Sequence, residues 1–166
     1  MKKKLIIYVA LAFAMLLSSC ATQKKLNADT QQFRYEIECA GNGAQGTYLV
    51  KVWTYSKSPK ISATQCGKNA VHGVIFKGFA GEQGCVAQRA LVANPGAEIE
   101  HKDYFKLFFD DSQREYMKYV TLTSAPREIV KVGREYKVGV VVTVQKDALR
   151  KTLESVGVVR GLSHGF

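Results

Sequence analysis

Gly41–Gly46 (GNGAQG) has the glycine spacing of the loop that holds the pyrophosphate in dinucleotide-binding proteins. In those proteins a helix begins at the last glycine, and an acidic residue about 20 positions further on binds the ribose. Residues 47–55 are instead rich in β-branched and aromatic side chains with period-two alternation, which predicts a strand, and no Asp or Glu occurs between Cys39 and Gly81. We therefore interpret the glycines as a hairpin turn between strands at 33–39 and 47–55, and we expect no nucleotide to bind.

The N-terminus carries a second chemical signal. Residues 2–4 are lysines, Leu5–Leu17 is an apolar run too short to span a bilayer comfortably, and Leu17-Ser18-Ser19-Cys20 follows. This combination resembles the lipobox of bacterial lipoproteins. The resemblance implies a signal peptide at 1–19, cleavage before Cys20 and lipidation of that cysteine, which would anchor the protein in a membrane. The alternatives are an uncleaved anchor helix or a secretory signal with a chance cysteine.

The remaining cysteines are Cys39, Cys66 and Cys85, an odd number, so at most one intramolecular disulfide forms. Cys39 is in phase with the apolar side of its strand and Cys66 lies on the apolar side of a predicted helix, which favours burial of both. Cys85 follows a glycine-rich stretch and is expected to be the most exposed. No cysteine has the histidine spacing of a zinc site or a catalytic thiol. Because no nucleophile with a base, no pair of carboxylates and no set of metal ligands shows convincing spacing either, we predict no metal, no cofactor and no catalytic residue, and hence no enzyme.

Charge and the segment after Cys20 bear on location. Loss of Lys2, Lys3 and Lys4 with the signal leaves 21 of the 24 basic residues against 14 acidic ones, a net charge of +7. In the cell envelope nucleic acid is not an expected partner, whereas anionic lipids, acidic glycans and acidic proteins are; a positive balance also favours solubility. Residues 20–32 are polar and aperiodic, which predicts a lipidated tether. No acidic residue follows Cys20 closely, so the sequence gives no support for the acidic signals that export lipoproteins to the cell surface or retain them in the inner membrane. We therefore expect the protein at the outer membrane, facing the periplasm.

Ser58-Pro59 is typical of a helix start, and apolar or small residues continue on one side as far as Phe76. Gly67 and Gly73 lower helix propensity, which close approach to a sheet would explain. His72 lies away from this apolar side and near polar residues, so we expect it to be solvated.

The rest of the chain predicts further elements around one sheet. They are a long loop at Gly78–Pro95 with a short helical piece near 86–92, a helix at Glu98–Asp111 with Phe105, Phe108 and Phe109 on one face, strands at 116–123 and 136–144, and a last helix from Asp147 to Gly157 with Leu149, Leu153 and Val156 on one stripe. We predict an α+β fold for a single domain at 33–166. Its single antiparallel sheet of about four strands, in the order ββα-α-ββα, carries the helices on one face.

Alternation along the second strand divides its side chains into two sets. Tyr48, Val50, Val52 and Thr54 project to one side, and Leu49, Lys51, Trp53 and Tyr55 project to the other. If the helices cover the first set, the open face presents Lys51, Trp53 and Tyr55, which we propose as candidate partner-binding residues. The alternative is that the long loop folds back over Trp53 and makes it part of the core.

Three stretches together resemble a group of uncharacterised lipoproteins from Bacteroidota: GTYLVKVWTYSK (46–57), AVHGVIFKGFAG (70–81) and KVGVVVTVQKDALRKTLESVGVVRGL (137–162). This resemblance implies no activity. The order of elements is also similar to that of small envelope lipoprotein domains that serve flagellar, curli-secretion or penicillin-binding-protein-activating systems. We therefore expect a non-enzymatic lipoprotein that is an adaptor or accessory factor of a cell-envelope assembly, with an envelope protein as partner. The alternative is a lipoprotein that binds a glycan or another small molecule.

Overall fold

The computed structural model describes residues 33–61, 63–81 and 84–161. The predicted signal peptide, Cys20 and the predicted tether at 20–32 therefore lie outside the described residues. The chain divides into two units, Met1–Arg34 and Tyr35–Phe166. In the second unit the core is built from that unit's own side chains.

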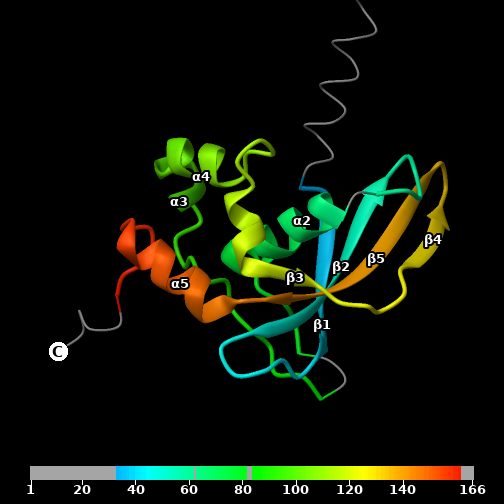
Figure 1. Ribbon diagram of the computed structural model, residues 1–166, viewed down its shortest axis with the longest axis horizontal. Coiled ribbons are helices and arrows are strands. Elements are labelled where there is room, and N and C mark those ends of the chain that lie inside the picture. Colours follow the sequence, from blue (N-terminus) through cyan, green and yellow to red (C-terminus); the bar gives the residue numbers. More distant parts are fainter. Residues whose placement is uncertain (1–32, 62, 82–83, 162–166) are drawn as a thin grey trace, which may run out of the picture. The chain divides into compact units, whose positions relative to one another are not determined.

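One antiparallel sheet organises the second unit (Figure 1), which confirms the predicted α+β class and its single sheet. The sheet has five strands rather than about four. β5 is the central strand, because it pairs with β2 along one edge and with β4 and then β3 along the other, while β1 pairs with the far edge of β2. The strands are β1 (Tyr35–Gly41), β2 (Tyr48–Ser56), β3 (Val120–Leu122), β4 (Glu128–Val132) and β5 (Glu135–Val144).

The glycine segment forms the turn between β1 and β2, as interpreted from the sequence. Gly41 and Gly46 have φ angles of +142° and +80°, values that favour glycine over residues with a side chain. The turn closes through the Thr47 amide and hydroxyl, which both donate to the Ala44 carbonyl. A strand follows the turn, so this segment lacks the helix N-terminus that would face a pyrophosphate.

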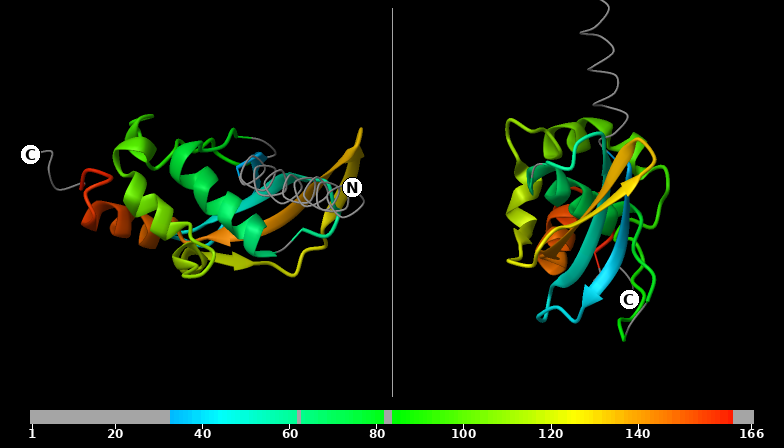
Figure 2. Two further views of the ribbon diagram at one scale, coloured as in Figure 1. Left: turned by 90° about the horizontal axis from the view of Figure 1, so that it is seen from above. Right: turned by 90° about the vertical axis from the view of Figure 1, so that its right-hand side faces the viewer.

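The helical segments are α2 (Ala63–Phe76), α3 (Ala97–Glu100), α4 (Lys102–Phe108), the 3₁₀ helix η1 (Glu115–Tyr119) and α5 (Lys146–Ser155). In the right-hand view of Figure 2, α2 and η1 lie to one side of the strands. α2 packs on β1, β2, β3 and β5, and it is buried at every position from Cys66 to Ile75.

The two helix glycines permit close packing, as expected. A Cβ atom at Gly73 would lie 2.8 Å from Cδ1 of Ile37 on β1, and one at Gly67 would lie 3.1 Å from Cγ1 of Val120 on β3. The predicted start at Ser58-Pro59 is wrong, however. The Ser56 and Ser58 hydroxyls accept hydrogen bonds from the backbone amides of Ser58 and Lys60, and these local turns replace the first helical turn.

The long loop lacks the short helix predicted near 86–92, because tertiary partners take its backbone groups. Phe79 and Gln88 exchange both amide-to-carbonyl hydrogen bonds, and the Leu91 and Val92 amides donate to carbonyls of α2. The helix predicted at 98–111 is two helices, because the backbone of His101 departs from helical geometry between α3 and α4. Its aromatic stripe is core as expected, since Phe105, Phe108 and Phe109 are all buried.

The C-terminal half differs from prediction at three places. Only the end of the strand predicted at 116–123 is extended, because η1 carries the fully buried Tyr116 into the core. β4 was not predicted; every residue in it is exposed, and Gly133, with φ of +60°, turns it into β5. α5 buries Leu149 and Leu153 as predicted, but Val156 is exposed after the helix ends.

Candidate functional site

The three predicted residues of β2 lie on one face of the sheet, opposite α2. Val50, Val52 and Thr54 are buried under the helix, whereas Lys51, Trp53 and Tyr55 alternate with them and are half-buried. We call the face that bears Lys51, Trp53 and Tyr55 the open face. Residues that lie opposite one another in paired strands point to the same side of the sheet, so the open face also includes residues from the neighbouring strands. They are Glu36 and Glu38 from β1, Lys137 and Gly139 from β5, and Glu128 from β4.

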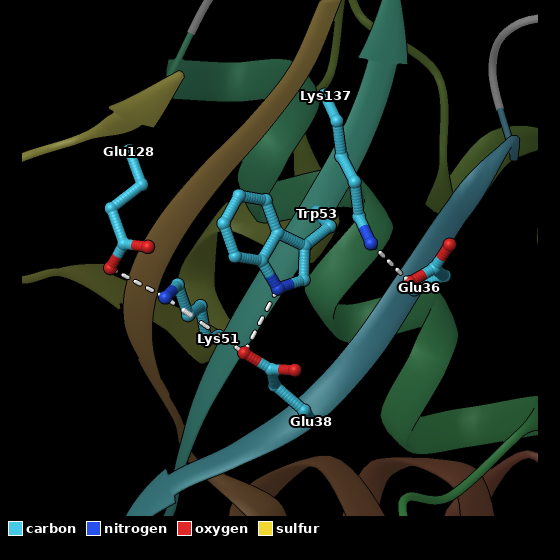
Figure 3. Close-up of polar contacts among 6 residues, drawn as sticks. All are labelled: Glu36, Glu38, Lys51, Trp53, Glu128 and Lys137. Atoms are coloured by element: carbon cyan, nitrogen blue, oxygen red, sulfur yellow. Dashed lines mark hydrogen bonds and ion pairs between the residues drawn. The ribbon is translucent and has the colours of Figure 1, made fainter. Parts of the chain in front are cut away.

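Trp53 occupies the middle of the open face (Figure 3). Its six-membered ring lies against Gly139, where an added Cβ atom would come within 2.7 Å of the ring. Its indole N–H donates to Oε1 of Glu38 at 2.9 Å. The ammonium groups of Lys51 and Lys137 lie 4.3 Å and 5.0 Å from the ring centroid, within the range of cation–π attraction. The indole is thus positioned by its own strand neighbours.

Carboxylates and ammonium groups alternate around the indole. Lys137 donates to Oε2 of Glu36 at 2.6 Å, and the Tyr55 hydroxyl donates to the other oxygen of the same carboxylate. Lys51 donates to Oε1 of Glu128 at 2.5 Å. The hydrogen bond from Lys137, followed by the one from Tyr55, lowers the pKa of Glu36, and the same bond to Glu36 raises the pKa of Lys137. This arrangement displays an aromatic patch inside a frame of fixed charges.

The long loop contacts the sheet on the other face. Cys85 forms a disulfide with Cys39, whose side chain shares the side of Tyr35 and Ile37. The Tyr48 hydroxyl donates to Oε1 of Gln88 at 2.7 Å. The expectation that Cys39 is a buried small hydrophobe is therefore wrong, because Cys39 is half-buried and bonded to Cys85; Cys85, expected to be the most exposed, is half-buried as well. Cys66 is a free, buried cysteine as expected, and burial raises the pKa of its thiol.

A second polar group was missed by the sequence analysis. His72 is only 5% exposed, so the expectation that it is solvated is wrong. Its Nδ1 lies 2.6 Å from the Tyr35 hydroxyl, its Nε2 lies 3.3 Å from Oε1 of Glu98, and its ring packs against Phe76 and Phe109. Phe76 lies one turn along α2 itself, whereas Tyr35, Glu98 and Phe109 come from β1, α3 and the residue after α4. Nothing near His72 in the sequence points to them, so no local signal could have placed it in the core.

Burial lowers the pKa of His72 to about 3, and the nearby charge of Lys77 acts in the same direction. Burial also raises the pKa of Glu98, and it raises that of the Tyr35 hydroxyl, which stays protonated. In a neutral imidazole one nitrogen donates and the other accepts. Because an ionised carboxylate only accepts, Nε2 donates to Glu98 and Nδ1 accepts from Tyr35.

Beside Tyr35, His72 and Glu98 lies a cleft of about 590 Å³. It is lined by His72, Phe76, Lys77, Arg89, Ala90, Val92, Ala93, Asn94, Pro95 and Glu98. We call it the His72 cleft. Its wall is largely apolar, and it contains two cationic side chains, Lys77 and Arg89. Lys77 donates to the Tyr35 carbonyl at 3.3 Å and lies 3.8 Å from the centroid of the Tyr35 ring, and burial lowers its pKa. Arg89 forms no ion pair with another described residue.

In residues 33–61, 63–81 and 84–161, His, Cys, Asp and Glu side chains form no group of three or more that would hold a metal ion. Within the same ranges no helix combines the length and the apolar character needed to cross a membrane. No protein-family model, curated protein or solved structure matches the chain.

Proposed function

We propose that this protein is a non-enzymatic lipoprotein of the cell envelope, anchored through a lipid on Cys20 in the periplasmic leaflet of the outer membrane. Its domain is an adaptor or accessory factor of an envelope assembly. It binds another envelope protein through the open face, with Lys51, Trp53 and Tyr55 at the centre.

The observation that carries this proposal is the asymmetry of the sheet. One face is covered by α2, and the other presents Trp53 and Tyr55 half-buried in a frame of lysines and glutamates. Tryptophan and tyrosine dominate binding energy when a partner buries them, and a charged rim around them favours a specific orientation of the partner. The frame also fixes the aromatic rings in advance, which reduces the entropy that binding would otherwise cost.

Photo-crosslinking in intact cells tests the partner. A photo-reactive amino acid at Tyr55 is expected to capture one recurrent envelope protein, identified by mass spectrometry. The matched control places the same group at Leu107, which is exposed on α4. Once the partner is purified, Trp53→Ala should weaken its binding by about 2 kcal/mol or more. Capture of the same proteins from both positions would remove the open face as the binding site.

Lipid anchoring is tested separately at Cys20. Metabolic labelling with a fatty-acid analogue is expected to label the wild-type chain, and Cys20→Ala should abolish the label and leave the protein in soluble fractions or as an unprocessed precursor. Cys66→Ala is the matched control, because Cys66 is a buried thiol inside the domain. Equal label on Cys20→Ala and wild type would contradict the lipobox interpretation.

The His72 cleft favours a second function, that of a lipoprotein which binds a small molecule. An apolar wall with a few convergent polar groups is the usual form of a ligand site, and about 590 Å³ lies within the range of such sites. Lys77 and Arg89 favour an anion with an apolar body. A glycan on Trp53 is less favoured, because Gly139, Lys51 and Lys137 already contact the indole.

1-Naphthoate is a suitable probe of this second function, with neutral 1-naphthamide beside it. Titration calorimetry on the chain from residue 20 should show saturable naphthoate binding that Arg89→Gln weakens about tenfold, since hydrogen bonds to charged groups contribute about 1.5–3 kcal/mol. Lys106→Gln, an exposed change on α4, should leave it unaltered. Equal affinity for naphthoate and naphthamide, or equal effects of the two substitutions, would argue against an anion site.

A further inference from the structure

At one end of the sheet, the start of β1 lies near the exposed β4–β5 hairpin. β1 begins at Tyr35, opposite Thr54 near the end of β2, and Ser56 at that end pairs with Tyr136 of β5. The β4–β5 turn lies just beyond, where Val132 pairs with Glu135. Figure 1 shows the end of β2 and this turn together, away from α5. The segment that leads back to Cys20 therefore joins the domain at the end that carries the turn.

Basic side chains concentrate at this end. Lys57 and Lys60 follow β2, Lys131 lies near the end of β4, and Arg134 lies in the β4–β5 turn. All four are exposed, and none forms an ion pair with another described residue. We call these four residues the basic end. This differs from the open face, where each lysine is paired with a carboxylate.

Aliphatic side chains accompany the charges on the same hairpin. Ile129, Val130 and Val132 of β4 are 52%, 48% and 47% exposed. Because Val130 lies opposite Lys137 and Ile129 opposite Val138, the three project to both faces of the hairpin. Exposed aliphatic residues mixed with lysine and arginine are the composition with which proteins enter the interface of a bilayer.

We propose that the basic end docks on an anionic lipid surface, with the β4–β5 turn entering the headgroup region. The inference rests on the proposed lipid anchor at Cys20. Residues 20 to 34 reach about 50 Å at most when fully extended, so an anchored domain stays close to the bilayer surface. Each basic residue near an anionic surface strengthens binding about fivefold, which is too weak alone and effective beside an acyl anchor.

Vesicle co-sedimentation tests the docking without the anchor. The chain from residue 20, with Cys20→Ser so that no lipid is attached, is mixed with vesicles of phosphatidylcholine alone or of phosphatidylcholine with phosphatidylglycerol. Binding is expected only to the vesicles that contain phosphatidylglycerol, and about 0.5 M salt should abolish it. Lys131→Gln with Arg134→Gln should weaken it at least tenfold.

The matched control neutralises the same number of charges elsewhere. Lys102→Gln with Lys106→Gln, both exposed on α4, should change vesicle binding less than about twofold. Val130→Ser with Val132→Ser should weaken binding without altering its dependence on salt. Equal losses in the two charge-neutralised variants, or equal binding to both kinds of vesicle, would overturn the proposal. Because no lipid is attached to this chain, the result does not depend on the labelling experiment at Cys20.

β4 is also a sheet edge, and strand pairing with a second copy is the competing use of this end. Size-exclusion chromatography of the same chain separates the two. A monomer that binds anionic vesicles supports docking on lipid. A dimer that Val130→Ser with Val132→Ser dissociates, and that does not bind the vesicles, would assign this end to self-association instead and overturn the proposal.

Discussion

The two faces of the sheet use polar side chains in opposite ways. Between α2 and the sheet the buried Asn69 donates to the Thr54 hydroxyl at 3.0 Å, and elsewhere on the same helix Lys68, 2% exposed, pairs with Asp111 at 2.6 Å. On the open face, pairs such as Lys137 and Glu36 have similar distances but remain in contact with water. A buried group that loses its partner bears the full cost of desolvation, whereas an exposed one is hydrated again. The covered face should therefore determine stability, and the open face is free to determine binding.

The largest expected effect lies on the covered side, at the disulfide. Cys39→Ser with Cys85→Ser opens a loop of 46 residues, for which the chain-entropy model gives a loss of about 4 kcal/mol in the free energy of unfolding. Urea denaturation of the oxidised protein and the double variant measures it. A reductant should destabilise the wild type by a similar amount and leave the variant unchanged. A loss below about 1 kcal/mol would mean that the loop is held by its other contacts.

The next effect is a dependence of stability on pH that arises from His72. Its pKa is about 3 in the folded protein against 6.5 for an ordinary histidine, so the unfolded chain binds more protons between these values. The contribution of the neutral His72 to the free energy of unfolding is then fully present above pH 6.5 and is lost as the pH drops toward 3. Each pH unit within the window removes about 1.4 kcal/mol, or about 3 kcal/mol by pH 4.5. His72→Gln should abolish this slope in urea denaturation measured at several pH values.

Glu98 provides the control for that experiment. Burial raises its pKa above the ordinary value of 4.5, so it contributes stability at low pH that is lost as the pH rises through its folded pKa. This slope opposes that of His72 over its interval. Glu98→Gln should therefore steepen the loss of stability on acidification, whereas His72→Gln should remove it. Similar slopes in both variants would show that other groups govern the acid response.

The elements that the sequence predicted well have strong local patterns. The turn at Gly41–Gly46 needs positive φ angles that glycine provides, and the valine-rich run of β5 and the leucine stripe of α5 each have one period. β4 was missed because none of its residues is buried, so burial imposes no alternating pattern that marks a strand. His72 of α2 was misread for the opposite reason: it is buried, but Tyr35, Glu98 and Phe109, which contact it, come from distant segments.

The candidate site was predictable only in part. Alternation along β2 suffices to place Lys51, Trp53 and Tyr55 on one side, because it requires no knowledge of other strands. The carboxylates that hold them come from β1 and β4, and Glu128 is 77 residues from Lys51. The disulfide and the contact of His72 with Tyr35 also join distant segments. A single sequence gives no register between such segments, so these contacts needed the fold.

Trp53 lies on the open face but is half-buried, so its substitution tests how much that face contributes to stability. Trp53→Ala removes the packing on Gly139 and the hydrogen bond to Glu38, and we expect a loss of about 2 kcal/mol, below the 3–5 kcal/mol of a fully buried tryptophan. Trp53→Phe keeps an aromatic ring over Gly139 and should lose less. Urea denaturation gives both values. Complete unfolding of Trp53→Ala would make Trp53 part of the core, and the binding site would then lie elsewhere.

The smallest effect is expected at Glu36, although its carboxylate accepts hydrogen bonds from both Lys137 and Tyr55. Its carboxylate is more than half exposed, so its bonds to Lys137 and Tyr55 should contribute less than about 1 kcal/mol to stability. Because those bonds lower its pKa below 4.5, that contribution is present above pH 4.5 and is lost as the pH falls through the folded pKa, a lower window than that of His72. Glu36→Gln should therefore leave the midpoint of urea denaturation nearly unchanged at neutral pH. It should nevertheless weaken the partner captured from Tyr55, since Tyr55 and Lys137 lose the carboxylate that positions them. A large loss of stability would place the charged frame with the core, and the distinction between the two faces would fail.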